Sequence, residues 1–528
     1  MKRIRDALPI KAIREDLVKA LQTHQVVVVS GGTGSGKSTQ CPQYILEDAI
    51  QQGEGPNTRI IVTQPRRIAA ISVAERVAAE RDEPIGNSVG FAVRLHGNSP
   101  RDAANIEFVT TGVLLRRLMR DQNLEGISHV MIDEVHERDI NTDFLLVLLR
   151  ELITTRPDLR VVLMSATLDA ESFSDYFAGE DTQEKVPLMS VPTKPRWPVE
   201  IVHLEDMLDG GGELEVEDEM EVSEDEDDVD DDDDDVDDVD PALEDMAMKL
   251  EDEVSELTIQ LLAEVAKHVA AIETDAGRKG SILCFLPGWD EIKSAMAILE
   301  ETTDPELYEK LNVIPLHSTI PQEEQQKVFI PAPDGVVKVI LATNIAESSV
   351  TINDVLAVVD SGLVREMSWN AESGMSTMGT VGTSRASATQ RTGRAGRVAP
   401  GSCYRIYSHG TLHAMAERPT PEIQRTALEA TCLQTCSMTN TGVQHFLSKA
   451  MDPPSDETVE YAMDRLFKLG AIKTNEASGG EVLTPMGRLL SILPLDPGTG
   501  RMLIMGAVMK CLDPVLTAAA CFSSRDPF

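Results

Sequence analysis

The stretch that decides the fold of this chain is Val26-Val-Val-Val-Ser-Gly31-Gly-Thr-Gly-Ser-Gly-Lys37-Ser38-Thr39. The four valines predict a buried strand, and Gly31 to Ser38 match the pattern GxxxxGK[ST]. The run after Lys37 is compatible with a helix, so the motif has the strand and helix context that a phosphate-binding loop requires. The alternative is a chance glycine-rich turn.

Strand-like apolar runs alternate with amphipathic segments on both sides of this stretch. Short buried strands separated by helices predict a parallel sheet covered on both faces. The fold class is therefore α/β, with two tandem parallel-sheet domains at 1–200 and 257–418. The runs are Val26–Val29, Ile60–Val62, Val130–Ile132, Val161–Met164, Ile282–Phe285, Val313–Leu316, Val337–Leu341 and Leu356–Val359.

An acidic insert separates the two blocks. Residues 205–256 hold 29 acidic residues and one lysine, and they account for most of the net charge of −40. A block of like charges without aromatic residues buries too little apolar surface to fold, so we expect 205–245 to be disordered. The charge excludes a uniformly basic, histone-like protein, and any nucleic acid must be held in a local groove.

The cysteine and hydropathy patterns indicate in which cellular compartment the protein is expected. Seven cysteines in 528 residues form no CxxC pair, which argues against a disulfide scaffold and a structural zinc site. No apolar run is long enough for a membrane helix, and the N-terminus lacks the apolar core of a secretory signal. We expect a reducing nuclear or cytoplasmic location, with an organelle not excluded, and a monomer without membrane contact.

The glycine-rich loop predicts a nucleoside triphosphate and Mg²⁺ as ligands. Its backbone N–H groups can surround the β-phosphate, Lys37 can contact the β- and γ-phosphate oxygens, and the Ser38 hydroxyl can bind Mg²⁺. The expected nucleotide-binding residues of the loop are Gly32, Thr33, Gly34, Ser35, Gly36, Lys37, Ser38 and Thr39.

Two carboxylates end the predicted strand Val130–Ile132. Asp133 is suited to hold Mg²⁺ through water, and Glu134 can bind the metal shell, orient the attacking water and deprotonate it. The alternative is a solvated acid pair at a strand end.

With these motifs, the sequence resembles the RHA-like branch of the DEAH/RHA family of superfamily 2 helicases. Val135 departs from the literal DEAH string. The resemblance implies two RecA-like domains and an ATP-dependent RNA helicase that moves 3′-to-5′ on single-stranded RNA and remodels RNA structures and RNPs. Further motifs that carry it are Thr63-Gln-Pro-Arg66-Arg67, Thr110-Thr111-Gly112, Ser165-Ala-Thr167, Phe285-Leu-Pro-Gly288, Leu341-Ala-Thr343-Asn344-Ile-Ala-Glu347 and Gln390-Arg-Thr-Gly-Arg394-Ala-Gly-Arg397.

The last motif has a physical interpretation. If 390–397 is helical, Gln390, Arg394 and Arg397 share one face and Arg391 points elsewhere. Two guanidinium groups can neutralise charge on a transferring γ-phosphate, and Gln390 can position water. These groups belong to the second domain, so we expect ATP to close the two domains. The alternative is an arginine-rich surface helix that binds nucleic-acid phosphates.

The resemblance also assigns coupling and nucleobase contacts. Ser165, Thr167 and His136 would link the nucleotide to the domain interface, and Arg76 and Phe329 would stack on the base. Stacking without hydrogen-bond recognition accepts any nucleobase, so other NTPs are expected to replace ATP. A core aromatic is the alternative for Phe329.

For nucleic acid, the resemblance implies backbone contacts with single-stranded RNA or with RNA that has a 3′ overhang. A solvated pair at a helix start is the alternative for the two arginines. A β-hairpin is expected within 364–380, and protein cofactors remain open. The implied contacts are Arg66, Arg67, Thr111, Gly288, Thr343 and Asn344.

The last third is predicted to be helical, and it resembles a winged-helix domain at 419–487 and the truncated start of a ratchet domain at 488–528. The ending at Phe528 resembles a fragment boundary. Two rival functions remain: a DNA helicase of the same mechanism, and an ATP-gated RNA clamp or scaffold without processive unwinding.

The acidic insert is either a solvated loop or an RNA mimic that docks on the basic channel.

Under the mimic hypothesis, deletion of 205–245 raises RNA affinity at low salt, because a competing polyanion is removed. Fluorescence anisotropy with a labelled oligonucleotide measures the RNA affinity, and an affinity that the deletion leaves unchanged contradicts the hypothesis.

Overall fold

A computed structural model describes residues 5–32, 34–165, 170–178, 186–192, 197–208, 241–301, 310–333, 335–347, 352, 354–370, 373–439, 441–474 and 480–523; 208, 241–255, 322 and 523 are described by backbone alone. The chain divides into two compact units. Unit 1 comprises Met1–Thr193, Met367–Gly379 and Thr420–Phe528. Unit 2 comprises Lys194–Glu366 and Thr380–Pro419.

The sheet of unit 1 has eight strands in the order β4-β3-β5-β2-β6-β7-β1-β8, and all neighbours are parallel except β3 and β4. This confirms the predicted α/β class. The strands are β1 (Val26–Ser30), β2 (Arg59–Gln64), β3 (Val89–Val93), β4 (His96–Asn98), β5 (Asn105–Thr110), β6 (His129–Ile132), β7 (Arg160–Ser165) and β8 (Leu188–Ser190).

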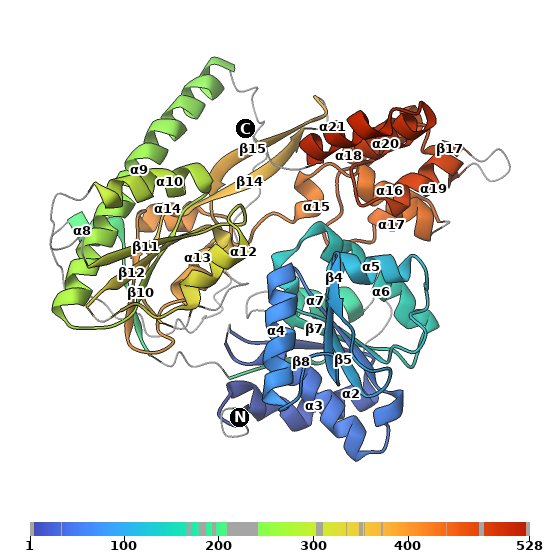
Figure 1. Cartoon of the computed structure of the whole chain (residues 1–528), viewed down its shortest axis with the longest axis horizontal. Helices are drawn as coiled ribbons and strands as arrows, with labels where there is room; N and C mark the ends of the chain where they lie inside the picture. The colour runs from blue at the N-terminus through green and yellow to red at the C-terminus, as the bar shows by residue number, and fades with distance from the viewer. Residues whose placement is uncertain are drawn as a thin grey trace, which may run out of the picture. The chain divides into compact units, whose positions relative to one another are not determined.

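Helices cover both faces of this sheet (Figure 1). Along β1, Val26 and Val28 join the core formed with α5 and α6, while Val27 and Val29 join the core formed with α2, α3 and α4. Burial on both faces explains the unbroken valine run. The helices are α2 (Arg14–Thr23), α3 (Lys37–Gln51), α4 (Arg67–Glu80), α5 (Thr111–Leu118), α6 (Ile140–Thr155) and α7 (Ala170–Ala178).

Unit 2 contains a parallel six-stranded sheet in the order β11-β12-β10-β13-β16-β9. Its strands are β9 (Val199–Val202), β10 (Ser281–Phe285), β11 (Leu311–Leu316), β12 (Val337–Ala342), β13 (Val355–Asp360) and β16 (Gly401–Arg405). Its helices include α8 (Leu204–Leu208), α9 (Pro241–Asp275), α10 (Trp289–Glu300), α12 (Gln322–Gln325), α13 (Arg385–Thr392) and α14 (His409–Ala414).

The acidic insert lies between β9 and α9. Residues 205–208 form most of α8, and residues 241–245 begin α9, so the expected disorder of 205–245 is wrong at both ends. The most acidic part, 209–240, lies outside the described residues. Because β9 pairs with β16, the units divide near residue 194, whereas the sequence placed the end of the first domain at 200.

A β-hairpin and a helical segment complete the chain. The hairpin joins β14 (Leu363–Asn370) and β15 (Met375–Gly382), as expected within 364–380. The C-terminal elements are α15 (Glu422–Arg425), α16 (Glu429–Met438), α17 (Val443–Leu447), α18 (Asp456–Lys468), β17 (Ile472–Thr474), β18 (Glu481–Leu483), α19 (Pro485–Ile492), α20 (Pro497–Val508) and α21 (Leu512–Ser523). Helices followed by an antiparallel pair suit a winged helix, which stays a prediction. Among the described helices, none is both long and apolar enough to cross a membrane.

The C-terminal helices share a core with the first sheet. Phe144 of α6 and Phe446 of α17 are both buried, and their ring centroids are 5.3 Å apart. At the edge of this contact, Lys449 forms an ion pair of 2.8 Å with Glu151. The two segments of unit 1 are therefore one packed body despite their separation in sequence.

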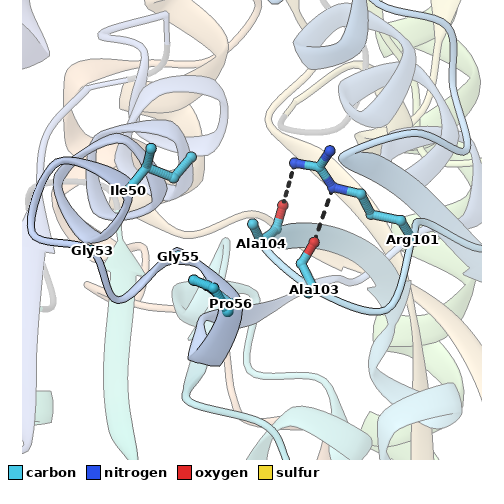
Figure 2. Close-up of a pocket in the computed structure, with 7 residues that line it drawn as sticks. All are labelled: Ile50, Gly53, Gly55, Pro56, Arg101, Ala103 and Ala104. Atoms are coloured by element: carbon cyan, nitrogen blue, oxygen red, sulfur yellow. Dashed lines mark hydrogen bonds between the residues drawn. The ribbon is translucent and has the colours of Figure 1, made fainter.

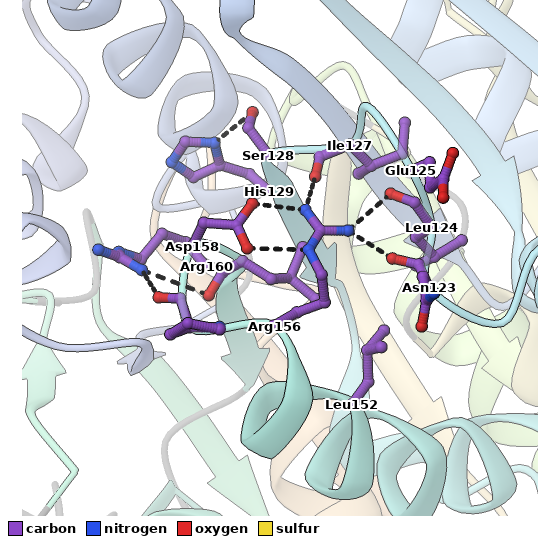
Figure 3. A network of polar contacts seen from close by, with 12 residues as sticks. Asn123, Leu124, Glu125, Ile127, Ser128, His129, Leu152, Arg156, Asp158 and Arg160 are labelled. Carbon is purple, nitrogen blue, oxygen red and sulfur yellow. Dashed lines mark hydrogen bonds and ion pairs between the residues drawn. The ribbon is translucent and has the colours of Figure 1, made fainter.

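An arginine anchors the loop that leads into β6 (Figure 3). Arg156 donates hydrogen bonds to the carbonyl oxygens of Asn123, Leu124 (3.0 Å) and Ile127 (3.1 Å). It also forms an ion pair of 2.7 Å with Asp158. Satisfying these carbonyl groups fixes the entry to the strand that carries Asp133 and Glu134 at its other end.

Replacing Phe446 with alanine should lower the free energy of unfolding by about 3–5 kcal/mol, because it opens a cavity between α6 and α17. The matched control is Phe467→Ala, since Phe467 of α18 is 39% exposed. Thermal melting of both variants measures the effect. Equal melting temperatures for the two variants would contradict the shared core.

Candidate nucleotide-binding site and nucleic-acid contacts

The glycine-rich loop leaves β1 at Ser30 and enters α3 at Lys37. Gly34 and Gly36 have φ angles of +80° and +98°, a region that favours glycine. A Cβ at Gly36 would also lie 3.0 Å from Ile10 Cγ2. The backbone thus has the tight loop that the motif predicts; Thr33 lies outside the described residues.

Lys37 is the charged group of this loop. Its side chain is buried, and Nζ donates hydrogen bonds to the carbonyl oxygens of Gly31 and Gly32, the latter at 3.2 Å. The buried Ser35 Oγ has no hydrogen-bond partner among the described residues. A fixed cation and an unsatisfied hydroxyl in one loop suit a phosphate group.

Asp133 follows β6 and lies beside the start of α3. Its Oδ2 accepts a hydrogen bond of 2.6 Å from Gln64 Nε2, and its Oδ1 accepts one of 3.0 Å from the Glu134 backbone. The Ser38 hydroxyl lies near this carboxyl. Burial, and after it the Glu134 carboxylate, raises the pKa of Asp133 to about 6.

The structure therefore brings together Ser38 and Asp133, two of the predicted Mg²⁺ ligands. The described residues hold no cluster of three His, Cys, Asp or Glu side chains that could enclose a metal. One hydroxyl and one or two carboxylates fit Mg²⁺, which usually keeps waters and takes phosphate oxygens as its other ligands.

Glu134 has a strained backbone, with φ of +52°. The turn that follows, Val135–Glu137, places His136 Nδ1 3.6 Å from Glu134 Oε2. His136 is buried, so it can fix the orientation of this carboxylate. Glu134, predicted to be catalytic, and His136, predicted to be a coupling residue, therefore lie side by side.

Ser165 lies at the end of β7, opposite Ser30 in the parallel register. Its carbonyl oxygen accepts a hydrogen bond of 3.2 Å from the Gly31 backbone, so this strand supports the start of the phosphate loop. The coupling partner predicted beside it, Thr167, lies outside the described residues.

Arg76 is exposed on α4, as a nucleobase contact must be. Glu80, buried on the same helix, accepts a hydrogen bond of 2.8 Å from Arg76 Nε. It also accepts hydrogen bonds from Gln40 Nε2 (2.7 Å) and Gln43 Nε2 (3.0 Å) of α3. These hydrogen bonds keep the pKa of Glu80 below its ordinary value against the opposing effect of burial. The sequence analysis missed this network because its members are 37 to 40 residues apart.

The predicted nucleic-acid contacts of unit 1 follow the carboxyl ends of β2 and β5. Arg66 lies at the N-cap of α4 and pairs with Glu137 at 3.6 Å, whereas Arg67 is exposed. Thr111 begins α5 and is buried, with Oγ1 3.5 Å from Thr142 Oγ1. These strands pair in parallel, so the contacts share one sheet edge with Asp133.

The predicted contacts of unit 2 follow β10 and β12, which are also parallel neighbours. Gly288 leads into α10, and a Cβ there would lie 2.7 Å from Glu291 Oε2. Thr343 is buried at the N-cap of a short helical turn, and Asn344 is exposed. All three lie at the carboxyl edge of the second sheet.

The expected helix over 390–397 is wrong. Helix α13 ends at Thr392, because Gly393 and Gly396, the latter with φ of +68°, are poor helix formers. Gln390 is in the last turn of the helix, and Arg394 and Arg397 follow it in a bent segment.

Arg391 is held by carboxylates of its own unit. It is buried and pairs with Asp360 (2.7 Å) and Glu347 (3.1 Å). Arg394, also buried, donates to the Glu347 carbonyl oxygen, and burial lowers the pKa of Arg397.

Phe329 ends a short helical turn, and its side chain is 51% exposed. The alternative that it is a core aromatic is therefore wrong. An exposed phenyl ring retains the stacking surface that the nucleobase role requires.

A shallow cavity of about 440 Å³ lies at the other end of α3 (Figure 2). Ile50 lies roughly 20 Å along α3 from Lys37 at the helical rise per residue. Arg101 lines the cavity and donates to the Ala103 carbonyl oxygen at 3.0 Å. None of the predicted site residues lines it.

Comparison with known families agrees with this geometry. The DEAD/DEAH box helicase family matches residues 11–175, the helicase conserved C-terminal domain matches 261–399, and the ratchet-like helicase associated domain (HA2) matches 496–528. A phosphate loop, a strand-end acid pair and two parallel sheets define the class: a helicase with two RecA-like domains.

Within this class, the chain is similar to DExH-box helicases. It is 42% identical to the DExH-box ATP-dependent RNA helicase DExH3 of Arabidopsis thaliana over 99% of this chain and 44% of that protein. It is 39% identical to the ATP-dependent DNA/RNA helicase DHX36 of Homo sapiens over 100% of this chain and 53% of that protein. The chain thus spans about half the length of these relatives.

Asp139, which follows the acid pair, caps α6. It accepts hydrogen bonds from the backbone of Asn141 (3.1 Å) and Thr142 (3.2 Å). Burial, with the Glu422 and Glu137 carboxylates, raises the pKa of Asp139 to about 6. Because folding raises this pKa, stability falls as the pH rises from the ordinary pKa of the carboxyl to about 6, while the capping hydrogen bonds of Asp139 stabilise the folded state.

Asp139→Asn keeps the cap and removes the charge, so we expect its melting temperature to equal or exceed that of the wild type at pH 8. The gain should shrink at pH 5 and vanish below about pH 4, where the carboxyl is protonated in both the folded and the unfolded wild type. Asp139→Ala, the control, should be about 1 kcal/mol less stable than Asp139→Asn at both pH values, because it lacks the cap as well as the charge. If Asp139→Asn lost more stability relative to the wild type at pH 8 than at pH 5, the conclusion that the ionised carboxylate destabilises the folded state would be contradicted.

Proposed function

We propose that this chain is the motor of an ATP-dependent RNA helicase, a nucleoside triphosphatase that moves 3′-to-5′ on single-stranded RNA and remodels RNA structures and RNPs. The observation that carries the proposal is that Ser38, at the end of the phosphate loop, lies near Asp133, which is beside Glu134. The proposed nucleotide-binding and water-activating groups thus lie at one sheet edge.

In the proposed mechanism, Lys37 releases its two loop carbonyl groups and binds the β- and γ-phosphate oxygens. Ser38 and Asp133 would hold Mg²⁺, which neutralises phosphate charge when bound, with Glu134 in its outer shell. Glu134, oriented by His136, accepts the proton of the attacking water.

We further propose that Gln390 positions this water and that Arg394 and Arg397 neutralise charge on the γ-phosphate. Arg76 and Phe329 would stack on the base, so other nucleoside triphosphates should be accepted. Ser165 and Thr167 would couple hydrolysis to movement.

The proposed substrate is single-stranded RNA or RNA with a 3′ overhang, bound through Arg66, Arg67, Thr111, Gly288, Thr343 and Asn344. The chain would act as a monomer in the nucleus or cytoplasm, with protein cofactors possible in principle. DNA is the alternative substrate, because the similar protein DHX36 is named a DNA/RNA helicase. An ATP-gated RNA clamp without processive unwinding is a second alternative.

Glu134→Gln should lower kcat of the RNA-stimulated ATPase by at least about 100-fold with little change in nucleotide affinity, because the amide cannot accept the water proton. Glu125→Gln, an exposed carboxylate before β6, is the control. Steady-state kinetics and fluorescent-nucleotide binding measure the two quantities. Wild-type kcat in Glu134→Gln would overturn the proposed base.

Strand displacement on matched RNA and DNA duplexes with 3′ or 5′ overhangs tests substrate and direction. The proposal expects displacement of the RNA duplex with a 3′ overhang. ATP turnover without displacement would favour the clamp, and equal displacement of DNA would favour the broader substrate.

A further inference from the structure

Lys338 is a buried charge that the proposed mechanism does not use. It lies on β12, between β10 and β11, and its side chain is 1% exposed. An ammonium group in a sheet core is costly unless each of its donors is satisfied. Its contacts therefore indicate what it stabilises.

The three donors of Lys338 reach one turn and one carboxylate. Nζ donates hydrogen bonds to the carbonyl oxygens of Val328 (2.8 Å) and Ile330 (3.2 Å). It also lies 2.9 Å from Asp354 Oδ2. Three partners use the full capacity of an ammonium group.

The two carbonyl groups flank Phe329. Val328 is fully buried, while the ring of Phe329 is 51% exposed. Because one interior cation holds the backbone on both sides of Phe329, the Cα–Cβ bond of Phe329 cannot turn inward without breaking a buried, charge-assisted hydrogen bond. The ammonium thus determines where the ring stands.

We propose that Lys338 is a positioning residue that holds Phe329 ready to stack on the nucleobase. The inference rests on the proposed function, in which Phe329 contacts the base. Lys338 itself touches neither nucleotide nor nucleic acid in this scheme. Asp354 has the subsidiary role of neutralising the buried ammonium.

A methionine at 338 fills a similar volume without donors, so Lys338→Met tests the role. We expect KM for ATP to rise about fivefold to tenfold, as for loss of one aromatic stack, with kcat within twofold of wild type. Inorganic tripolyphosphate, which has no base, should inhibit wild type and variant with the same Ki. A merely structural defect would change both constants.

The matched control is Lys327→Met, since Lys327 is an exposed lysine of the same turn that pairs with Glu324. It should leave KM unchanged. In a double-mutant cycle, Phe329→Ala should raise KM as much as Lys338→Met, and the double variant should show no further increase.

The outcomes separate the two proposals. If Phe329→Ala leaves KM for ATP unchanged, the stacking function is overturned. If Phe329→Ala raises KM but Lys338→Met does not, or if their effects multiply, the positioning role is overturned. Should Lys338→Met fail to fold by thermal melting, Lys338→Gln decides, because its shorter, uncharged amide has two donors for the three acceptors: an unchanged ratio of ATP KM to tripolyphosphate Ki overturns the positioning role.

Discussion

The parallel pairing of β1 with β7, and of β7 with β6, is the constraint on which the rest of unit 1 depends. Parallel strands end at the same edge, so the phosphate loop after β1 and the acid pair after β6 must be close in space. A shift of one residue in this register would move each side chain to the opposite face. Both hydrophobic cores and the placement of Ser38 near Asp133 would then be lost.

Charged side chains hold three further parts of the chain in place. Glu80 holds Arg76 against α3, Lys338 holds the turn of Phe329, and Arg156 holds the loop before β6. Each of the three satisfies backbone or amide groups as well as a charge. Such networks are stable only when every member is paired, so each allows a single local geometry.

The sequence predictions were correct where a short local pattern determines the structure and less accurate elsewhere. The valine run of β1 and the apolar run of β6 were correct because burial on both faces leaves a continuous apolar signal. Strand β9 was missed because Val199 to Val202 is only partly buried and includes Glu200. The helix over 390–397 was wrong because α13 ends before Gly393, a poor helix former, although the spacing of Gln390, Arg394 and Arg397 fits a helix.

The sequence by itself determined two α/β cores, a phosphate loop and an acid pair, because hydrophobic period and local motif chemistry are written in neighbouring residues. Only the tertiary structure decided that Arg391 is buried while Phe329 is exposed, and that the C-terminal helices join the core of the first sheet. The physical reason is that burial and ion pairing depend on which distant groups meet, as Phe144 and Phe446 do. Such contacts between residues far apart in the sequence form only in the folded chain and cannot be inferred from neighbouring residues.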